Sequence, residues 1–185
     1  MIAISNRQRA SLVGILILLA YSMLTYTITK NATLGVITDI ISGLAVICIP
    51  LLMFSIFNTN NNKIVNYLYL ISRFIEGILM IIGAIFILNP SLESYREFIY
   101  SDIHIYFFII GALLFYILLY RTQVVPRFIS IWGVIATVVL FIVTMVKLVG
   151  VNIEVLNLLV IPIVLNEIFL AIWLIVKGFN SEKLN

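Results

Sequence analysis

Two charged residues, Arg73 and Glu76, lie inside an apolar run that is long enough to cross a membrane. A charge at the centre of a membrane helix is unfavourable unless it meets a partner or water, and such residues commonly mark ion, proton or solute sites. The spacing i, i+3 places the guanidinium and the carboxylate on one face of a helix. The sequence therefore predicts a polar site within the membrane that is built around this pair.

A third charge, Glu167, lies in the last apolar run of the chain. Arg73 and Glu167 each stand about ten residues from one end of their runs, and a rise of ~1.5 Å per residue places both ~15 Å deep. We predict an inward-facing cluster of Arg73, Glu76 and Glu167, with Asn166 and Tyr69 as hydrogen-bond partners. With all three groups ionised the cluster would be net negative, so we expect one glutamate to hold and carry a proton.

The same cluster also allows a purely structural interpretation. A buried ion pair can hold two helices together without serving any chemistry. The sequence leaves open whether Arg73 belongs to a binding site or to such a lock.

A second polar group can be assembled from Asp39, His104 and Lys147, which lie near the outer ends of the second, fourth and fifth apolar runs. Side chains at such positions ordinarily reach towards headgroups and water. We therefore regard this outer group as a weaker candidate site.

The composition indicates a membrane protein. Of 185 residues, 63% are hydrophobic and 10% are charged, and the mean hydropathy is +1.21, whereas soluble domains are roughly 25% charged. The lipid bilayer is therefore the expected environment. The net charge of +3 comes from basic residues scattered at the ends of apolar runs, so no nucleic-acid patch is expected.

The hydropathy pattern predicts an all-α, polytopic protein with six transmembrane helices in a single domain. The first run is read as an uncleaved span, because it is longer than the apolar region of a signal peptide. Between the third and fourth spans, either a short interfacial helix or an irregular loop fits the pattern. The predicted spans cover about residues 11–29, 34–57, 64–88, 103–120, 127–149 and 153–177.

The basic residues predict the orientation of the chain. An even number of spans puts both termini on one side, and seven of the 11 Lys and Arg residues fall on that side, three on the other and one within the membrane. Loops rich in Lys and Arg stay in the cytoplasm. The N-terminus and the C-terminus are therefore both predicted to lie inside.

Residues for familiar enzyme chemistry are scarce in this chain. One histidine and one cysteine, Cys48, exclude a His-x-x-x-His zinc site, a bis-histidine haem and a site with several thiolates. There is no Gly-x-Ser-x-Gly nucleophile elbow and no phosphate-binding glycine loop. No catalytic residue, metal ligand or cofactor is therefore assigned, and an enzyme is the least favoured class.

Several short motifs spread over most of the chain carry a family resemblance. They are Arg9 before Gly14, Arg73-x-x-Glu76, the run from Gly111 to Arg121, Pro126-Arg127 with Gly133, and the closing run from Pro162 through Glu167 to Gly178. Together they resemble the bacterial membrane family called domain of unknown function 4386. The resemblance implies a multi-pass protein of the bacterial cytoplasmic membrane, and it supports treating Arg73, Glu76 and Glu167 as a set. It brings no activity with it.

Two classes of function follow from these patterns. The leading hypothesis is a protein that binds or transports a small solute, an ion or a proton through the Arg/Glu cluster. The alternative is a non-catalytic accessory or regulatory subunit, in which the ion pair is structural and the apolar surface meets a membrane partner or a second copy of the chain. The ligand, the partner and the oligomeric state are not specified by the sequence.

Overall fold

The computed structural model of the chain describes residues 4–151 and 153–183, and this part of the chain is helical without any strand. Six stretches are long and apolar enough to cross a membrane, as the hydropathy pattern predicts. They run over Asn6–Thr29, Ala32–Phe57, Lys63–Phe86, Glu93–Thr122, Arg127–Leu148 and Val155–Val176.

Three of the spans are single helices and three are built from shorter pieces. The single helices are α3 (Ala32–Phe57), α4 (Lys63–Phe86) and α7 (Arg127–Leu148). The composite spans join α1 (Asn6–Ala20) to α2 (Leu24–Thr29), α5 (Glu93–Phe98) to α6 (Ile105–Thr122), and α8 (Val155–Leu158) to α9 (Ile161–Val176).

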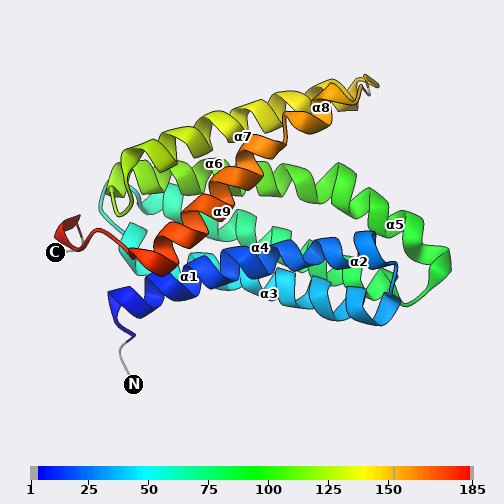
Figure 1. The fold of residues 1–185 in the computed structure, drawn as a ribbon, viewed down its shortest axis with the longest axis horizontal. Coiled ribbons are helices and arrows are strands. Elements are labelled where there is room, and N and C mark those ends of the chain that lie inside the picture. The colour runs from blue at the N-terminus through cyan, green and yellow to red at the C-terminus, as the bar shows by residue number, and fades with distance from the viewer. Residues whose placement is uncertain (1–3, 152, 184–185) are drawn as a thin grey trace.

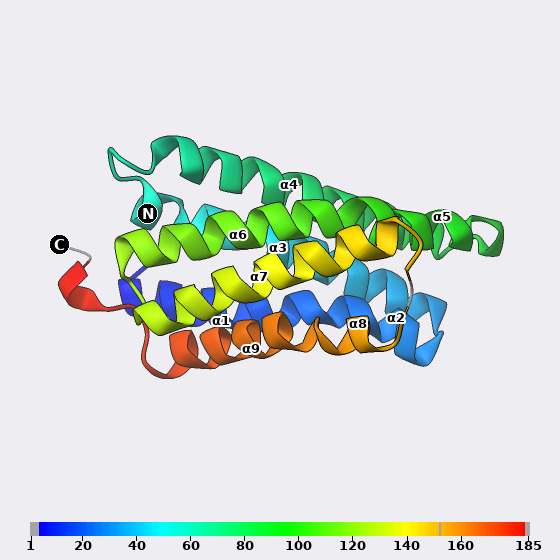
Figure 2. The ribbon, with the colours of Figure 1, turned by 90° about the horizontal axis from the view of Figure 1, so that it is seen from above.

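The six spans form a closed ring. Neighbours around it pack in the order α1, α3, α4, α6, α7 and α9, and α9 packs against α1 to close the circle. Figures 1 and 2 show the spans running along one common axis, with both chain ends at the same end of the bundle. This arrangement surrounds a central space to which every span can contribute side chains.

The first and last spans are each interrupted once, and both interruptions lie in the half of the span that is far from the chain ends. A 3-10 turn, Tyr21–Met23, separates α1 from α2, and a break after Leu158 separates α8 from α9. Pro162 lies in the first turn of α9, where its missing N–H breaks no helical hydrogen bond. The last span is therefore interrupted just before this proline, whereas α3 continues through Pro50 as one helix.

The fourth span begins at Glu93, ten residues before the predicted start at 103. Its first helix, α5, is joined to α6 by the π-helical segment Ile99–His104, so the connection after the third span is helical and continuous with the fourth. A span of 30 residues is ~45 Å long at ~1.5 Å per residue, which exceeds the ~30 Å hydrocarbon core of a bilayer. Figure 2 shows α5 extending past the other spans.

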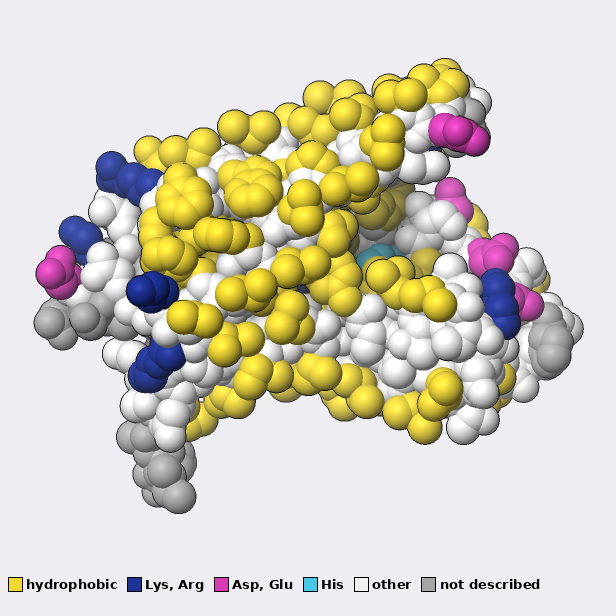
Figure 3. All heavy atoms as spheres, viewed as in Figure 1, with side chains coloured by type: hydrophobic (Ala, Val, Ile, Leu, Met, Phe, Trp, Pro, Cys, Tyr) yellow, Lys and Arg dark blue, Asp and Glu magenta, His cyan; other side chains and the backbone are white. Residues whose placement is uncertain are grey.

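The two ends of the bundle differ in charge. We call the end that carries both termini the basic end and the opposite one the acidic end (Figure 3). The basic end holds Arg7, Arg9, Lys63, Arg121, Arg127, Lys177 and Lys183, and the acidic end holds Glu93, Glu97, Asp102 and Glu154 together with Lys30 and Lys147. At the basic end, Arg7 donates to the last carbonyls of α9, at 2.7 Å from Ile175 O and 3.0 Å from Val176 O.

Candidate functional site

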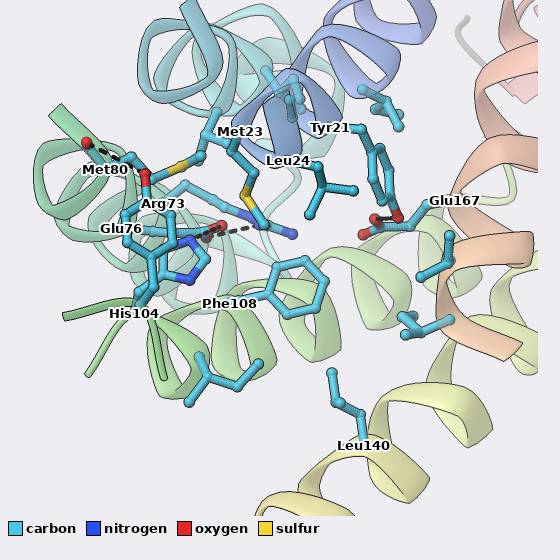
Figure 4. A pocket seen from close by; sticks show the side chains of 18 of the residues that line it. Tyr21, Met23, Leu24, Arg73, Glu76, Met80, His104, Phe108, Leu140 and Glu167 are labelled. Carbon is cyan, nitrogen blue, oxygen red and sulfur yellow. Dashed lines mark hydrogen bonds and ion pairs between the residues drawn. The ribbon is translucent and has the colours of Figure 1, made fainter. Parts of the chain in front are cut away.

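A central cavity of about 470 Å³ lies within the ring and is lined by residues of all six spans. Small-molecule sites commonly enclose ~300–1,000 Å³ of mostly apolar surface with a few polar groups. Most of the lining here is apolar or aromatic, and Arg73, Glu76, His104 and Glu167 are polar groups among it (Figure 4). The cavity thus has the size and the kind of wall that a small ligand requires.

Arg73 and Glu76 form a buried ion pair at the cavity wall. The Arg73 Nη1 donates to the Glu76 Oε2 at 2.7 Å, and Glu76 is only 2% exposed. Both residues belong to α4, one turn apart, as their spacing predicts. The ion pair therefore lies within one helix and does not by itself join two helices.

The position of the Arg73 side chain is set by its own helix and by α6. The guanidinium carbon lies 5.8 Å from the centre of the Tyr69 ring and 5.5 Å from that of the Phe108 ring, and aromatic faces attract cations at such distances. A Cβ at Gly111 would stand 2.8 Å from the Arg73 Nε. Glycine at this position therefore leaves the room that the guanidinium occupies.

Glu167 of α9 lines the same cavity but has a different partner. Its Oε2 accepts a hydrogen bond from the Tyr21 hydroxyl at 2.6 Å. Within the described part of the chain, no Lys, Arg or His nitrogen comes within 4.0 Å of the Glu167 carboxylate. In Figure 4 the Arg73 side chain reaches from Glu76 towards Glu167, and a gap remains before the second carboxylate.

Tyr21 was not anticipated as a member of the site. A signal for it exists in the sequence, because Tyr21 lies about ten residues into the predicted first span, which is the depth that links Glu167 to Arg73. Tyrosines of membrane proteins gather at the interfaces, so the sequence alone indicates interface positions for the tyrosines and does not assign Tyr21 to the site.

Of the two predicted hydrogen-bond partners of the cluster, Tyr69 lines the cavity and Asn166 does not. Tyr69 lines the cavity, is fully buried, and stacks on Phe115 with 5.4 Å between ring centres. Its hydroxyl has no hydrogen-bond partner among the described residues. Asn166 lies outside the cavity lining, and its amide donates to the Ile129 carbonyl of α7 at 3.0 Å. Asn166 therefore joins two helices, while Tyr69 belongs to the site.

The structure does not bring Asp39, His104 and Lys147 together. The His104 Nε2 lies 3.7 Å from the Glu76 Oε1, so this histidine joins the Arg73 and Glu76 group. Lys147 donates to the exposed Asn157 Oδ1 at 2.8 Å.

Asp39 instead pairs with Arg96, a residue that the depth count places outside the membrane. The Asp39 Oδ2 accepts from the Arg96 Nη2 at 2.8 Å and from the Nε at 3.2 Å, and both side chains are buried. The guanidinium carbon of Arg96 lies 4.8 Å and 4.5 Å from the ring centres of Tyr26 and Tyr100. This pair connects α3 to α5 at the acidic end of the cavity, where Arg96 and Tyr100 form part of the lining.

The cavity faces the acidic end of the bundle. Figure 1 shows α8 and the end of α7 standing away from α2 and α5 at that end, and Figure 3 shows the surface hollowed between them. Acidic side chains lie beside the hollow in Figure 3, towards the acidic end of the bundle. At the basic end, by contrast, α1 and α9 pack together and Arg7 bonds the end of α9.

Metal chemistry receives no support from the described side chains. No three His, Cys, Asp or Glu residues among them are grouped so that they could hold a metal ion.

Comparison with known proteins shows the family of the chain. The model of the family described as "Domain of unknown function (DUF4386)" matches residues 24–178, so the chain belongs to this family. Neither a curated protein nor a solved structure matches the chain. The matched range covers Tyr69, Arg73, Glu76, His104 and Glu167, while Tyr21 lies just before it.

Proposed function

We propose that this member of the DUF4386 family binds a small solute in the central cavity and moves that solute, or a proton, across the membrane. The observation that carries the proposal is that Arg73, Glu76 and Glu167 line one cavity of about 470 Å³. A structural lock would be a dry contact between helices, whereas here the ion pair lies within α4 and the third charge stands across the cavity.

The charges of the site support a role for protons. Arg73 neutralises Glu76, and Glu167 has a hydroxyl group as its hydrogen-bond partner. An ionised carboxylate without a cation is unfavourable in a low-dielectric site, so Glu167 favours either a proton or a positively charged ligand. Its carboxyl group can therefore link the occupancy of the cavity to proton binding.

The charge asymmetry of the bundle supports an orientation. With the basic end in the cytoplasm, the chain follows the rule that Lys and Arg stay inside, and the hollow then faces outwards. Together with the family resemblance, this favours a place in the bacterial cytoplasmic membrane.

Thiol accessibility tests whether water reaches the cavity. In a Cys48→Ala background, Val164→Cys places a thiol in the cavity lining, and Ile172→Cys places one on the outer surface of the same helix. We expect a charged, water-soluble methanethiosulfonate to modify Val164→Cys on the order of tenfold faster in liposomes, because the reactive thiolate needs water. Mass spectrometry of the modified protein gives both rates.

Equal and slow modification of the two thiols would show that the cavity is closed to water, and the proposal would then fail. Leu174→Cys is the control for the protein interior, because Leu174 is fully buried and lies outside the cavity lining. The alternative role as an accessory or regulatory subunit predicts a dry site and a membrane partner that co-purifies with the chain.

A further inference from the structure

We infer that the solute is a hydrophobic organic cation, such as an ammonium or phosphonium group carrying apolar substituents, which binds beside Glu167 in exchange for a proton. This inference rests on the proposed function and names the substrate class of the same cavity.

The first argument is the charge of the cavity. Arg73 and Glu76 form one ion pair at 2.7 Å, and Asp39 and Arg96 form another at 2.8 Å. Glu167 is then the one carboxylate of the lining without a basic partner among the described residues. A cavity with these groups ionised carries one negative charge, which a ligand with a single positive charge would neutralise.

The second argument is the chemistry of the wall. Tyr21, Tyr69, Tyr100, Phe108 and Phe115 all contribute to the lining, and most of the remaining lining residues are aliphatic. Aromatic faces attract cations, most strongly those that have lost their water, and apolar walls favour ligands with apolar groups. A small hydrated ion such as Na⁺ would find too few oxygen ligands here.

Two buried polar atoms of this wall, the Tyr69 hydroxyl and the His104 Nε2, make no hydrogen bond within the described chain. The Tyr69 hydroxyl belongs to a fully buried residue of the lining and makes no hydrogen bond within the described chain. Buried hydroxyl groups normally find a partner. A ligand with a hydrogen-bonding group or its accompanying water would supply one, in addition to the contact with Glu167.

The third argument is the approach to the cavity. The hollow opens at the acidic end, whose four acidic side chains outnumber the two lysines there. Clefts lined by one sign of charge concentrate ligands of the opposite sign. Cations are therefore favoured at the entrance as well as at the binding position.

Exchange of the cation for a proton follows from the fact that both would bind the same carboxylate, that of Glu167. The acid form of Glu167 releases its proton to water in the cavity, and the carboxylate then receives the cation, so the cavity has the same charge before and after. The charged and titratable groups that face Glu167 are Tyr21, Arg73, Glu76, Tyr69 and Tyr116. These neighbours surround Glu167 in both the proton-bound and the cation-bound site, and the carboxylate of Glu167 is the group among them that a cation can pair with.

Binding of tetraphenylphosphonium and tetraphenylborate to the purified full-length protein in detergent tests the inference. The two probes have the same shape and opposite charge. We expect tetraphenylphosphonium to bind at least about tenfold more tightly than tetraphenylborate, and Glu167→Gln to weaken its binding by at least about tenfold, because the partner of the charge is lost. Lower pH should also weaken cation binding in the wild type, and this pH dependence should be absent in Glu167→Gln.

The controls separate folding from recognition. Glutamine keeps the shape of the glutamate and can still accept from Tyr21, so Glu167→Gln should elute as the same species on gel filtration. Glu182→Gln changes an exposed acid at the basic end and should bind as the wild type does.

Stronger binding of tetraphenylborate, unchanged cation binding in Glu167→Gln, or binding of neither probe would overturn the inference. The proposed function depends on water access at Val164→Cys, so it can survive each of these results. A cavity closed to water would contradict both the proposed function and the inference about the organic cation.

Discussion

The guanidinium group of Arg73 is accommodated inside this bundle by an opposite charge, by two aromatic rings and by a glycine that leaves room for it. Glu76 supplies the opposite charge one turn away on the same helix. Tyr69 and Phe108 present their rings to the guanidinium carbon, and Gly111 leaves space beside the Nε. The first contact is visible in the sequence as an i, i+3 spacing, whereas the contacts across α6 depend on how the helices pack.

Glycines of α6 and α7 allow a test of how much room these buried side chains have. A Cβ at Gly133 would overlap the ring of Tyr116, which is fully buried, while a Cβ at Gly111 would meet the side chain of Arg73. Overpacking costs about 1–3 kcal/mol. We expect Gly133→Ala to lower the Tm in detergent more than Gly111→Ala, because a buried ring moves less easily than a flexible side chain.

The Tm of each variant can be measured by circular dichroism, with Ile110→Ala as a control on the exposed face of α6. A Gly133→Ala protein as stable as the wild type would contradict the packing around Tyr116.

At the scale of the helices, the acidic end is held by a pair that joins elements far apart in the sequence. Asp39 of α3 is fully buried against Arg96 of α5. From the sequence, Asp39 is grouped with His104 and Lys147 because all three lie near the outer ends of their predicted spans, and Arg96 is left in the connection between the third and fourth spans. The α5 helix returns Arg96 to the bundle, since the fourth span is longer than its apolar core indicates.

Replacing one partner of this pair should destabilise the protein strongly. Asp39→Ala leaves the Arg96 guanidinium buried without its carboxylate, and breaking such pairs costs about 3–5 kcal/mol. We expect a large fall in Tm for Asp39→Ala. The double variant Asp39→Leu with Arg96→Met should recover much of the loss, because apolar side chains can replace a buried pair at little cost.

Thermal unfolding in detergent measures both effects. Lys147→Met is the matched control, because the partner of the Lys147 ammonium within the described residues is the exposed Asn157 side chain. A double variant less stable than Asp39→Ala would show that the pair does more than neutralise charge.

The elements differ in how far the sequence predicts them. Six spans and the shared depth of Arg73 and Glu167 follow from hydropathy and from the rise of an α-helix. The Tyr21 bond to Glu167 requires that α1 and α9 be neighbours, and the ring order is set by packing between apolar surfaces that resemble one another. The place of Asn166 could not be predicted for the same reason. Glu167 faces the cavity, whereas the side chain of Asn166, the residue before it, donates to α7.

At the scale of the whole molecule, the ring is closed at one end and open at the other. Packing of α1 against α9 closes the basic end, and the surface is hollowed at the acidic end (Figure 3). Exchange of a ligand between the two sides of the membrane would require the basic end to open in turn. The break between α8 and α9 and the 3-10 turn between α1 and α2 are the points at which the α-helices of these two spans are interrupted.

The orientation of this asymmetric ring decides which compartment would supply the proposed ligand. Seven Lys and Arg residues flank the basic end, and such residues resist translocation. We expect green fluorescent protein fused after the C-terminus to fluoresce in a bacterial host, and alkaline phosphatase fused after Gly150 to be active, because Gly150 follows α7 at the acidic end. Phosphatase fused at the C-terminus should be inactive. The reverse pattern would turn the acidic entrance towards the cytoplasm, and the proposed cation would then enter the cavity from inside the cell.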